Sequence, residues 1–428
     1  MERKYIIRGG RPLKGEIEVK GAKNAALPAL ACTLLAKGNF LLKNVPKVRD
    51  VFCMLKILEH LGAKAQFDGS NLQIDTSGVK RTDIPYELAS QIRASILFLG
   101  ALTAAYGEAV IPRPGGCDIG KRPTDIHEKG LSLLSAELDF KHGNIITRAK
   151  RLKGAEIILD FPSVTATENL LMAASLAEGE TILKNAAKEP EVVFLAEMLS
   201  EMGAEIKGAG TDTIFIKGKK RLQPIKIKII PDRIEGGTFL ILSSLFLENE
   251  VIIKNLPIDY LETPCLKLKE MGIEVKKVDR NSYTVKRSKK IWPVEIVTAP
   301  YPGFPTDLQP LYAVLLTQAE GTSIIRENLF ENRFQYAFEL KRLGAKINVE
   351  DRVAVITGPT PLSGSPIKAT DLRAGAALLL AGLIAENTTT LYRVELIERG
   401  YENLPQRIRA LGGDIEVVEE ENEDSKKF

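Results

Sequence analysis

The sequence is poor in the residues that build metal centres and disulfide frameworks. It has four cysteines and three histidines in 428 residues. No Cys-x-x-Cys pair occurs, and the histidines lack the spacing of a metal-binding helix. The sequence therefore excludes the common zinc motifs, and we expect no metal ion. Cysteines scattered in this way, at positions 32, 53, 117 and 265, are typical of a chain kept reduced.

A large excess of charge of one sign is also missing. Lys and Arg number 59 against 55 Asp and Glu, which gives a formal net charge of +4. A dedicated nucleic-acid binder shows a strong basic patch or domain, so this balance argues against nucleic acid as a partner. It leaves room for a local cationic pocket that binds an acidic small molecule.

Long hydrophobic runs are absent as well. No stretch is long and apolar enough to span a bilayer, so we expect no membrane insertion. No signal-peptide pattern precedes the first strand-like run, residues 4–8. Together with the cysteine usage, this predicts a cytoplasmic protein.

What the sequence does contain is a sixfold repeat. A Leu-Gly or Met-Gly pair ends a helix-like stretch and leads into a strand-like one, at intervals of roughly 70 residues. Glycine is the residue expected just past a helix C-terminus, where the backbone turns left-handed. The five pairs begin at Leu61, Met202, Met271, Leu343 and Leu411, and the degenerate copy Leu134-Ser135-Ala136 fills the gap.

Each unit also carries a second helix that is apolar nearly all round, which predicts a buried helix. In the first unit it covers residues 24–36 and leads through Lys37-Gly38-Asn39 into a strand. Six such units predict an α/β protein. Because a chain of this length is too long for one core, we expect two domains of three units, divided near residues 220–231. An open solenoid is the alternative.

Residues 112–127 are rich in proline and glycine, which predicts a loop with exposed amides. This loop contains Cys117 together with cationic residues at positions 113, 121 and 122. Neighbouring positive charge favours the reactive thiolate form of a cysteine. A helix is predicted to start near Thr124 and to use Ile126, Gly130, Leu133 and Leu134 as one face; its N-terminus adds positive potential. The alternative is a surface turn that happens to hold a cysteine.

Several charged residues stand at the heads of apolar helices. Lys23 opens the first of them, where a positive charge opposes the helix dipole, so we expect an anionic ligand or a partner carboxylate beside it. A single arginine at such a position is most often a surface ion pair. Several at corresponding positions suggest guanidinium groups gathered to bind phosphate and carboxylate. These arginines are Arg93, Arg333, Arg373 and Arg399.

Asp307 follows the stiff segment Tyr301-Pro302-Gly303-Phe304-Pro305-Thr306. A carboxylate held in place by such a loop suits a general base. It also suits an N-cap for the helix that follows, and the residue types alone slightly favour that reading.

Long motifs, in a fixed order, give the chain a resemblance to a known family. They are Gly21-Ala22-Lys23-Asn24-Ala25-Ala26-Leu27-Pro28, Arg93-Ala94-Ser95, Pro114-Gly115-Gly116-Cys117, Arg122-Pro123, Pro231-Asp232-Arg233-Ile234-Glu235, Phe304-Pro305-Thr306-Asp307, Glu331-Asn332-Arg333, Ala369-Thr370-Asp371-Leu372-Arg373 and Arg399-Gly400-Tyr401-Glu402. Essentially from end to end, the chain resembles the UDP-N-acetylglucosamine enolpyruvyl transferases of the EPSP synthase-like superfamily.

The resemblance implies a fold of two inside-out α/β barrels, each of three βαβαββ units, which agrees with the six repeats. It implies an N-terminal domain of residues 22–230 that carries the cysteine loop. The C-terminal domain is then discontinuous and consists of residues 1–21 and 231–428. Its charged end, residues 419–428, is expected to be a solvated, disordered tail.

The resemblance also implies a reaction. The enolpyruvyl group of phosphoenolpyruvate is transferred to the 3′-hydroxyl of UDP-N-acetylglucosamine by addition and elimination, and phosphate is released. This is the first committed step of peptidoglycan precursor synthesis, and these two small molecules are the expected partners. No cofactor is implied, because the guanidinium groups supply the positive charge.

Residue roles follow from the matched motifs. Cys117 is implied as the general acid and as the residue that holds a covalent phosphoenolpyruvate adduct, and Asp307 as the base that takes the hydroxyl proton. The positive groups around phosphoenolpyruvate are Lys23, Arg93, Arg122 and Arg399. Further substrate-binding residues are Asn24, Pro123, Thr124, Asp125, Ile126, Ser163, Val164, Thr165, Leu329, Arg333, Asp371 and Arg373. The chain departs from the family beside the sugar-nucleotide site, at Pro123-Thr124 and Phe161-Pro162.

Two other function classes are to be compared with this one. The shikimate-pathway enolpyruvyl transferases share the fold, but they lack the loop cysteine and have Lys-Ser where this chain has Lys23-Asn24. A non-catalytic sugar-nucleotide binder on the same scaffold should have lost Cys117 or Asp307. This chain retains both residues.

Overall fold

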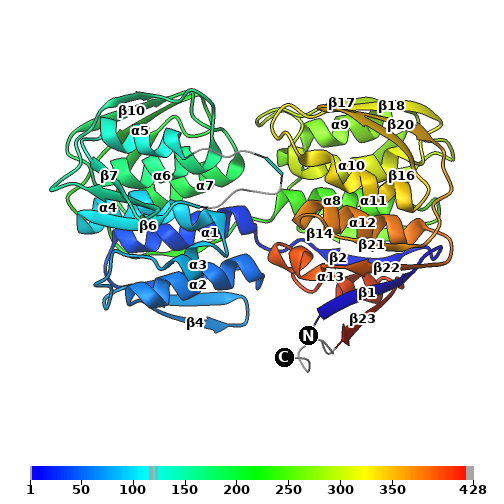
Figure 1. The fold of residues 1–428 in the computed structure, drawn as a ribbon, viewed down its shortest axis with the longest axis horizontal. Helices are drawn as coiled ribbons and strands as arrows, with labels where there is room; N and C mark the ends of the chain where they lie inside the picture. Colours follow the sequence, from blue (N-terminus) through cyan, green and yellow to red (C-terminus); the bar gives the residue numbers. More distant parts are fainter. Residues whose placement is uncertain (1, 115–118, 121–123, 421–428) are drawn as a thin grey trace. The chain divides into compact units, whose positions relative to one another are not determined.

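The structure, a computed structural model, describes residues 2–114, 119–120 and 124–420. These residues form two compact units (Figure 1). We call residues 21–114 and 124–230 the first unit, and residues 2–20, 119–120 and 231–420 the second unit. The N-terminal strands therefore belong to the unit built mainly from the C-terminal half of the chain.

The first unit alternates helices with short strands. Its helices are α1 (Lys23–Cys32), α2 (Arg49–Leu61), α3 (Tyr86–Ala89), α4 (Phe98–Tyr106), α5 (Asp125–Leu133), α6 (Val164–Ser175) and α7 (Pro190–Glu201). Its strands are β3 (Asn39–Lys43), β4 (Lys64–Asp68), β5 (Asn71–Asp75), β6 (Glu108–Pro112), β7 (Glu137–Lys141), β8 (Asn144–Arg148), β9 (Glu156–Ile158), β10 (Glu180–Lys184), β11 (Glu205–Lys207), β12 (Thr213–Lys217) and β13 (Lys226–Lys228).

The second unit repeats the same alternation. Its helices are α8 (Arg233–Ser244), α9 (Glu262–Glu270), α10 (Gln309–Leu316), α11 (Tyr336–Arg342), α12 (Leu372–Ile384) and α13 (Leu404–Ala410), with the 3-10 helices η4 (Thr306–Leu308) and η6 (Val394–Arg399) among the short ones. Its strands are β1 (Glu2–Arg8), β2 (Lys14–Glu18), β14 (Glu250–Lys254), β15 (Ile273–Asp279), β16 (Ser282–Arg287), β17 (Glu295–Val297), β18 (Gly321–Arg326), β19 (Lys346–Glu350), β20 (Val353–Gly358), β21 (Pro366–Lys368), β22 (Thr388–Tyr392) and β23 (Asp414–Glu420).

The strands of the described residues form six sheets, one for each predicted repeat. Five sheets have four strands, in which one parallel pair is extended by two antiparallel strands, as in the order β17-β18-β20-β19. The sixth, β6-β8-β7, has three strands. An isolated parallel bridge between Asp83 and Val110 stands where the fourth strand would pair. This weaker sheet belongs to the repeat whose glycine anchor is also degenerate.

The glycine anchors have the predicted conformation. Gly62 ends α2 with φ of 110°, and the glycines at positions 203, 272, 344 and 412 have φ between 81° and 111°. In the degenerate copy, Ser135 adopts the same left-handed conformation, with φ of 69°. Only a position with a strong need for this turn tolerates it without glycine, since a side chain makes it costly. The sixfold repeat is therefore confirmed at the level of the backbone.

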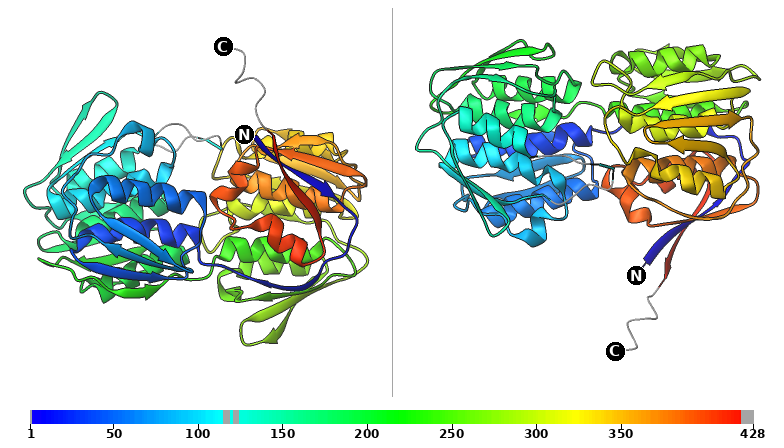
Figure 2. Two further views of the ribbon diagram at one scale, coloured as in Figure 1. Left: turned by 90° about the horizontal axis from the view of Figure 1, so that it is seen from below. Right: turned by 45° about the horizontal axis from the view of Figure 1, so that its top comes forward.

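Each unit has helices inside and sheets at its periphery (Figures 1 and 2). Every residue of α8 and of α10 is buried, and so are nine of the ten residues of α1. α1 and α10 are apolar nearly all round, as expected for buried helices, whereas α8 also buries polar residues, among them Arg233 and Glu235 in its first turn. The inside-out α/β architecture predicted from the repeat and the resemblance is thus confirmed.

The first unit is inserted into the second between residues 20 and 231, which lie close together in space. The amide of Ala22 donates to the carbonyl of Ile230 over 2.7 Å, within the first unit. The amide of Asp232 donates to the carbonyl of Lys20 over 2.8 Å, within the second. The two crossings between the units therefore lie side by side. The first falls between residues 20 and 21, where the sequence predicted 21 and 22, and the second falls between residues 230 and 231.

Two expectations about local structure need correction. The helix near Thr124 begins at Asp125, as predicted, but Leu133 is 46% exposed and is not part of its buried face. The helix ends at Leu133, and of the two leucines at this end only Leu134 is buried. Of the charged tail expected from residue 419, Glu419 and Glu420 instead belong to β23, where they pair with β1. Residues 421–428 lie outside the described part of the chain.

Candidate active site

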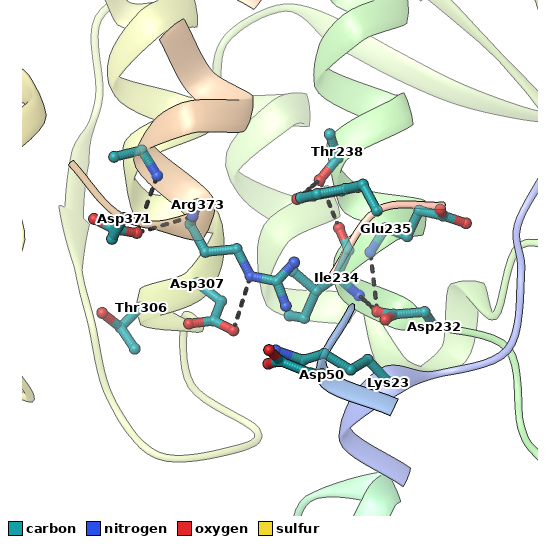
Figure 3. Close-up of polar contacts among 12 residues, drawn as sticks. Lys23, Asp50, Asp232, Ile234, Glu235, Thr238, Thr306, Asp307, Asp371 and Arg373 are labelled. Atoms are coloured by element: carbon teal, nitrogen blue, oxygen red, sulfur yellow. Dashed lines mark hydrogen bonds and ion pairs between the residues drawn. The ribbon is translucent and has the colours of Figure 1, made fainter. Parts of the chain in front are cut away.

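Asp307 lies between two buried guanidinium groups in the second unit. Arg333 Nη2 donates to Asp307 Oδ1 over 3.0 Å. Arg373 Nε donates to Asp307 Oδ2 over 3.1 Å, as Figure 3 shows. Arg333 is 2% exposed and Arg373 is 3% exposed. Asp307 is not an N-cap: it lies within η4, and α10 begins after Leu308 without a side-chain cap. The carboxylate is therefore oriented by ion pairs and not by helix capping.

The two arginines are themselves fixed from several sides. Arg333 also donates to the backbone carbonyl of Thr306 over 3.3 Å. Asp371 caps α12 by accepting the amides of Arg373 and Ala374, which sets the start of the helix from which Arg373 projects. Surface ion pairs gain little from such pairing, but these groups are desolvated and carry charge-assisted bonds. The surface ion-pair reading is therefore wrong for Arg333 and Arg373.

Tyr401 supports Arg373 on its other side. The guanidinium carbon lies 5.3 Å from the centre of the Tyr401 ring, and the Tyr401 hydroxyl is 2.8 Å from Thr238 Oγ1. Burial lowers the pKa of the Arg373 guanidinium, but Tyr401, Asp307 and Asp232 together raise it, and the net shift is upward. Arg373 thus stays charged beside Asp307. Arg399 ends η6, which packs against α12.

Lys23 opens α1 in the first unit and has a partner carboxylate. Its Nζ lies 3.2 Å from Asp50 Oδ2, and both side chains are buried (Figure 3). Asp50 comes from the first turn of α2, where a negative charge is favourable. Of the two expected ways to offset a lysine at a helix N-terminus, the structure shows the carboxylate. Asn24 follows in the same first turn and is half-buried.

His127 joins the two short segments that were predicted to contact the sugar nucleotide, residues 124–126 and 163–165. It lies on α5, and its Nε2 is 3.4 Å from Thr165 Oγ1 at the start of α6. Its Nδ1 is 2.9 Å from Nδ2 of Asn169, a buried residue of α6 that also bonds to Ile96 and Gly100. Burial, reinforced by Arg93, lowers the pKa of His127 to about 4.

This buried histidine predicts a pH-dependent stability. An unfolded histidine takes up a proton near pH 6.5, whereas native His127 stays neutral down to about pH 4. Lowering the pH through this window therefore lowers the free energy of unfolding. At about 1.4 kcal/mol per pH unit, the loss reaches about 3 kcal/mol. We expect His127→Gln to remove most of this loss, measured by urea unfolding at pH 7 and pH 5. The exposed His142, changed to Asn, is the control, and an equal loss in His127→Gln and the wild type would contradict the assignment.

We searched the described residues for groups of metal-ligating side chains and for helices that could span a membrane. Among residues 2–114, 119–120 and 124–420, no group of three or more His, Cys, Asp or Glu side chains is arranged to hold a metal ion. Within the same residues, no helix combines the length and the apolar character needed to cross a membrane.

Comparison with known proteins identifies the family. The family model described as EPSP synthase (3-phosphoshikimate 1-carboxyvinyltransferase) matches residues 7–408. UDP-N-acetylglucosamine 1-carboxyvinyltransferase 1 of Carboxydothermus hydrogenoformans is 51% identical over 415 residues, which cover 97% of this chain and 98% of the relative. The chain belongs to the UDP-N-acetylglucosamine 1-carboxyvinyltransferases of the EPSP synthase family.

Other relatives agree with this membership. The UDP-N-acetylglucosamine 1-carboxyvinyltransferase of Geotalea uraniireducens is 47% identical over 417 residues, 97% of this chain and all of that protein. Among solved structures, the enolpyruvyl transferase NikO from Streptomyces tendae matches with a TM-score of 0.89 at 28% identity, over 97% of this chain and 99% of that one. EPSP synthase from Acinetobacter baumannii matches with a TM-score of 0.75 at 20% identity, over 98% of this chain and all of that one, which shows the shared fold.

Some predicted residues of this family site lie outside the described part of the chain. They are Cys117, Arg122 and Pro123, with Lys121 beside them. Leu329 is described, and its amide donates to Glu327 Oε1 over 2.8 Å in the loop that follows β18. Four of the six predicted residues of the second unit, Asp307, Arg333, Asp371 and Arg373, form one cluster of ion pairs.

Sequence reasoning missed the residues that orient this machinery. Asp50, His127, Glu327 and Tyr401 make the contacts described above, and none was a candidate. Tyr401 does carry a weak signal, because it lies within the motif Arg399-Gly400-Tyr401-Glu402, whereas Glu327 lies outside the motifs. Asp50 gives no such signal, since an acidic residue in the first turn of a helix is expected on helix grounds alone.

Proposed function

We propose that this protein transfers the enolpyruvyl group of phosphoenolpyruvate to the 3′-hydroxyl of UDP-N-acetylglucosamine and releases phosphate. This would be the first committed step of peptidoglycan precursor synthesis. The proposal is supported by relatives of that name that match over nearly the whole chain. The structural observation that supports it best is Asp307, a carboxylate oriented by two buried guanidinium groups.

The proposed reaction is an addition followed by an elimination. The sugar hydroxyl oxygen forms a bond to C2 of phosphoenolpyruvate, while C3 accepts a proton. In the second half, C3 loses a proton, the bond from C2 to the phosphate oxygen breaks, and phosphate leaves. Proton transfers of this kind need an acid and a base held in place, and the tetrahedral intermediate needs positive charge around it.

Residue roles are assigned from the family motifs and from the described contacts. We assign Cys117 as the acid at C3 and Asp307 as the base at the hydroxyl. Two-point support from Arg333 and Arg373 holds the Asp307 carboxylate in one orientation, which is what a base acting on a single hydroxyl needs. The charges of phosphoenolpyruvate are assigned to Lys23, Arg93, Arg122 and Arg399.

Sugar-nucleotide recognition is assigned largely to the first unit. Residues 124–126 and 163–165 are brought together by His127, so that the N-terminal turns of α5 and α6 stand next to each other. Two helix N-termini favour an anionic group such as a diphosphate. We take the two units as the two domains of the enzyme, 22–230 and 1–21 with 231–428, and the cytoplasm as its site of action, where both substrates are soluble metabolites.

A phosphate-release assay tests the proposal. Purified protein is given phosphoenolpyruvate with UDP-N-acetylglucosamine, with shikimate 3-phosphate, or with no acceptor. We expect phosphate release only in the reaction in which UDP-N-acetylglucosamine is the acceptor. In that reaction, mass spectrometry should detect a product that carries one added enolpyruvyl group. Release with shikimate 3-phosphate would favour the shikimate-pathway activity, and tight sugar-nucleotide binding without release would favour a non-catalytic binder.

A further inference from the structure

Glu327 is a buried carboxylate at the point where two parallel strands end. β17 and β18 pair in parallel, with Val297 beside Arg326, so the carboxyl ends of both strands lie at the same end of the sheet. The segment after β17 leads through Thr298 to Asp307, and the segment after β18 begins with Glu327. Glu327 is 0% exposed. A carboxylate taken so completely out of water needs strong hydrogen-bond partners.

Four donors from three places converge on this side chain. Oε1 accepts Thr298 Oγ1 over 2.9 Å, the amide of Leu329 over 2.8 Å and the amide of Phe330 over 3.2 Å. Oε2 accepts Thr306 Oγ1 over 2.8 Å. One carboxylate thus ties the end of β17, the loop after β18 and the residue before Asp307 to a single point.

Thr306 receives a second restraint on its backbone. Its hydroxyl donates to Glu327, and its carbonyl accepts Arg333 Nη2 over 3.3 Å. The same Arg333 nitrogen donates to Asp307 Oδ1. The backbone that carries Asp307 is therefore fixed on one side by Glu327 and on the other by Arg333.

We propose that Glu327 is a positioning residue that holds Asp307, through Thr306, in the orientation needed for proton abstraction. It does not touch the reacting atoms. This inference rests on the proposed function, since it concerns the geometry of the assigned base. Misplacing a reacting group by about 1 Å can cost about a hundredfold in rate, so the tie has a measurable effect on turnover.

The decisive variant breaks only the link between Glu327 and the Asp307 segment. Thr306→Val keeps the shape of the side chain and removes the hydroxyl, whereas Thr306→Ser keeps the hydroxyl. We expect Thr306→Val to lower kcat by about 10- to 100-fold, with the Kd of UDP-N-acetylglucosamine changed by less than about threefold, and Thr306→Ser to recover most of the loss. Equal losses in both variants, or full turnover in Thr306→Val, would overturn the inference.

A double-mutant cycle tests whether Glu327 acts through Asp307. We expect the effects of Glu327→Gln and Asp307→Asn on kcat to be strongly non-additive. Once residue 307 is an asparagine it cannot act as a base, so loss of its positioning by Glu327 lowers kcat no further. Glu339→Gln is the matched control: Glu339 is 4% exposed in the same unit, but it accepts the amide of Lys368 and not a donor of the segment that leads to Asp307. Additive effects, or an equal loss of kcat in the control, would contradict the inference.

Amide hydrogen exchange separates this inference from the proposed function. We expect faster exchange in residues 299–308 in Thr306→Val than in Thr306→Ser, whatever reaction the protein catalyses. Unchanged exchange would show that Glu327 does not fix this segment. Absence of enolpyruvyl transfer in the wild-type protein, with faster exchange in Thr306→Val, would instead reject the function and leave the tie in place.

Discussion

Asp307→Ala is expected to lower kcat about a thousandfold while the Kd of UDP-N-acetylglucosamine changes by less than about tenfold. A base contributes in the transition state, where the hydroxyl proton is transferred, and much less in the bound ground state. Removal of Asp307 also leaves Arg333 and Arg373 without their shared carboxylate. Single-turnover rates and equilibrium binding of the sugar nucleotide measure the two effects separately.

Two further variants make this result interpretable. Asp307→Asn keeps the size and hydrogen-bonding oxygen of the side chain but removes its charge, so it should show a similar loss of kcat with a smaller loss of thermal stability. Asp414→Ala is the control, because Asp414 also pairs with two arginines of the same unit, Arg8 and Arg11, but at its surface. Normal turnover with weak sugar-nucleotide binding in Asp307→Ala would show that Asp307 is only a sugar contact.

Fosfomycin, an epoxide shaped like phosphoenolpyruvate, is expected to label Cys117 and none of the other three cysteines. The sequence places cationic residues around Cys117, which favours the thiolate that opens an epoxide. Cys32 and Cys53 are buried, and burial raises the pKa of Cys265 to about 12, so these thiols serve as internal controls. Mass spectrometry of the digested protein locates the adduct, and UDP-N-acetylglucosamine should promote it.

Cys117→Asp is the sharper form of this experiment. The variant keeps an acid in the loop and removes the nucleophile, so we expect it to retain turnover and to lose inhibition by fosfomycin. Labelling spread evenly over the four cysteines of the wild type would argue against an activated loop thiol. Inactivation of Cys117→Asp at the wild-type rate would show that Cys117 is not the target.

The parts of the fold that the sequence predicted are those set by local geometry. A left-handed turn after a helix is a property of one residue, so the anchors at Gly62, Gly203 and the later copies could be recognised directly. Helices that are apolar nearly all round, such as α1, are stable only when they are buried. The glycine anchor occurs five times, with one degenerate copy, and this regular spacing allowed the architecture to be predicted from the sequence.

The contacts that orient the site could not be predicted, because they join distant segments. Asp307 and Arg373 are 66 residues apart, and Lys23 and Asp50 are 27 apart. For Asp307, the residue types alone slightly favoured an N-cap. In the structure Asp307 instead pairs with Arg333 and Arg373. The glycine loop with Cys117 was found from its residue types, and its geometry lies outside the described residues.

The insertion of the first unit into the second also fixes an order of assembly during synthesis. Arg8 of β1 bonds to Asp414 of β23, 406 residues later, so the edge of β1 that pairs with β23 is covered only after those 406 residues have been made (Figure 2). Residues 21–114 and 124–230, in contrast, form a compact unit of their own, whose contacts can form once Ile230 has been made. Long-range pairing of this kind is slow and exposes a strand edge. We therefore expect the edges of β1 to stay unpaired during synthesis until β22 and β23 have been made.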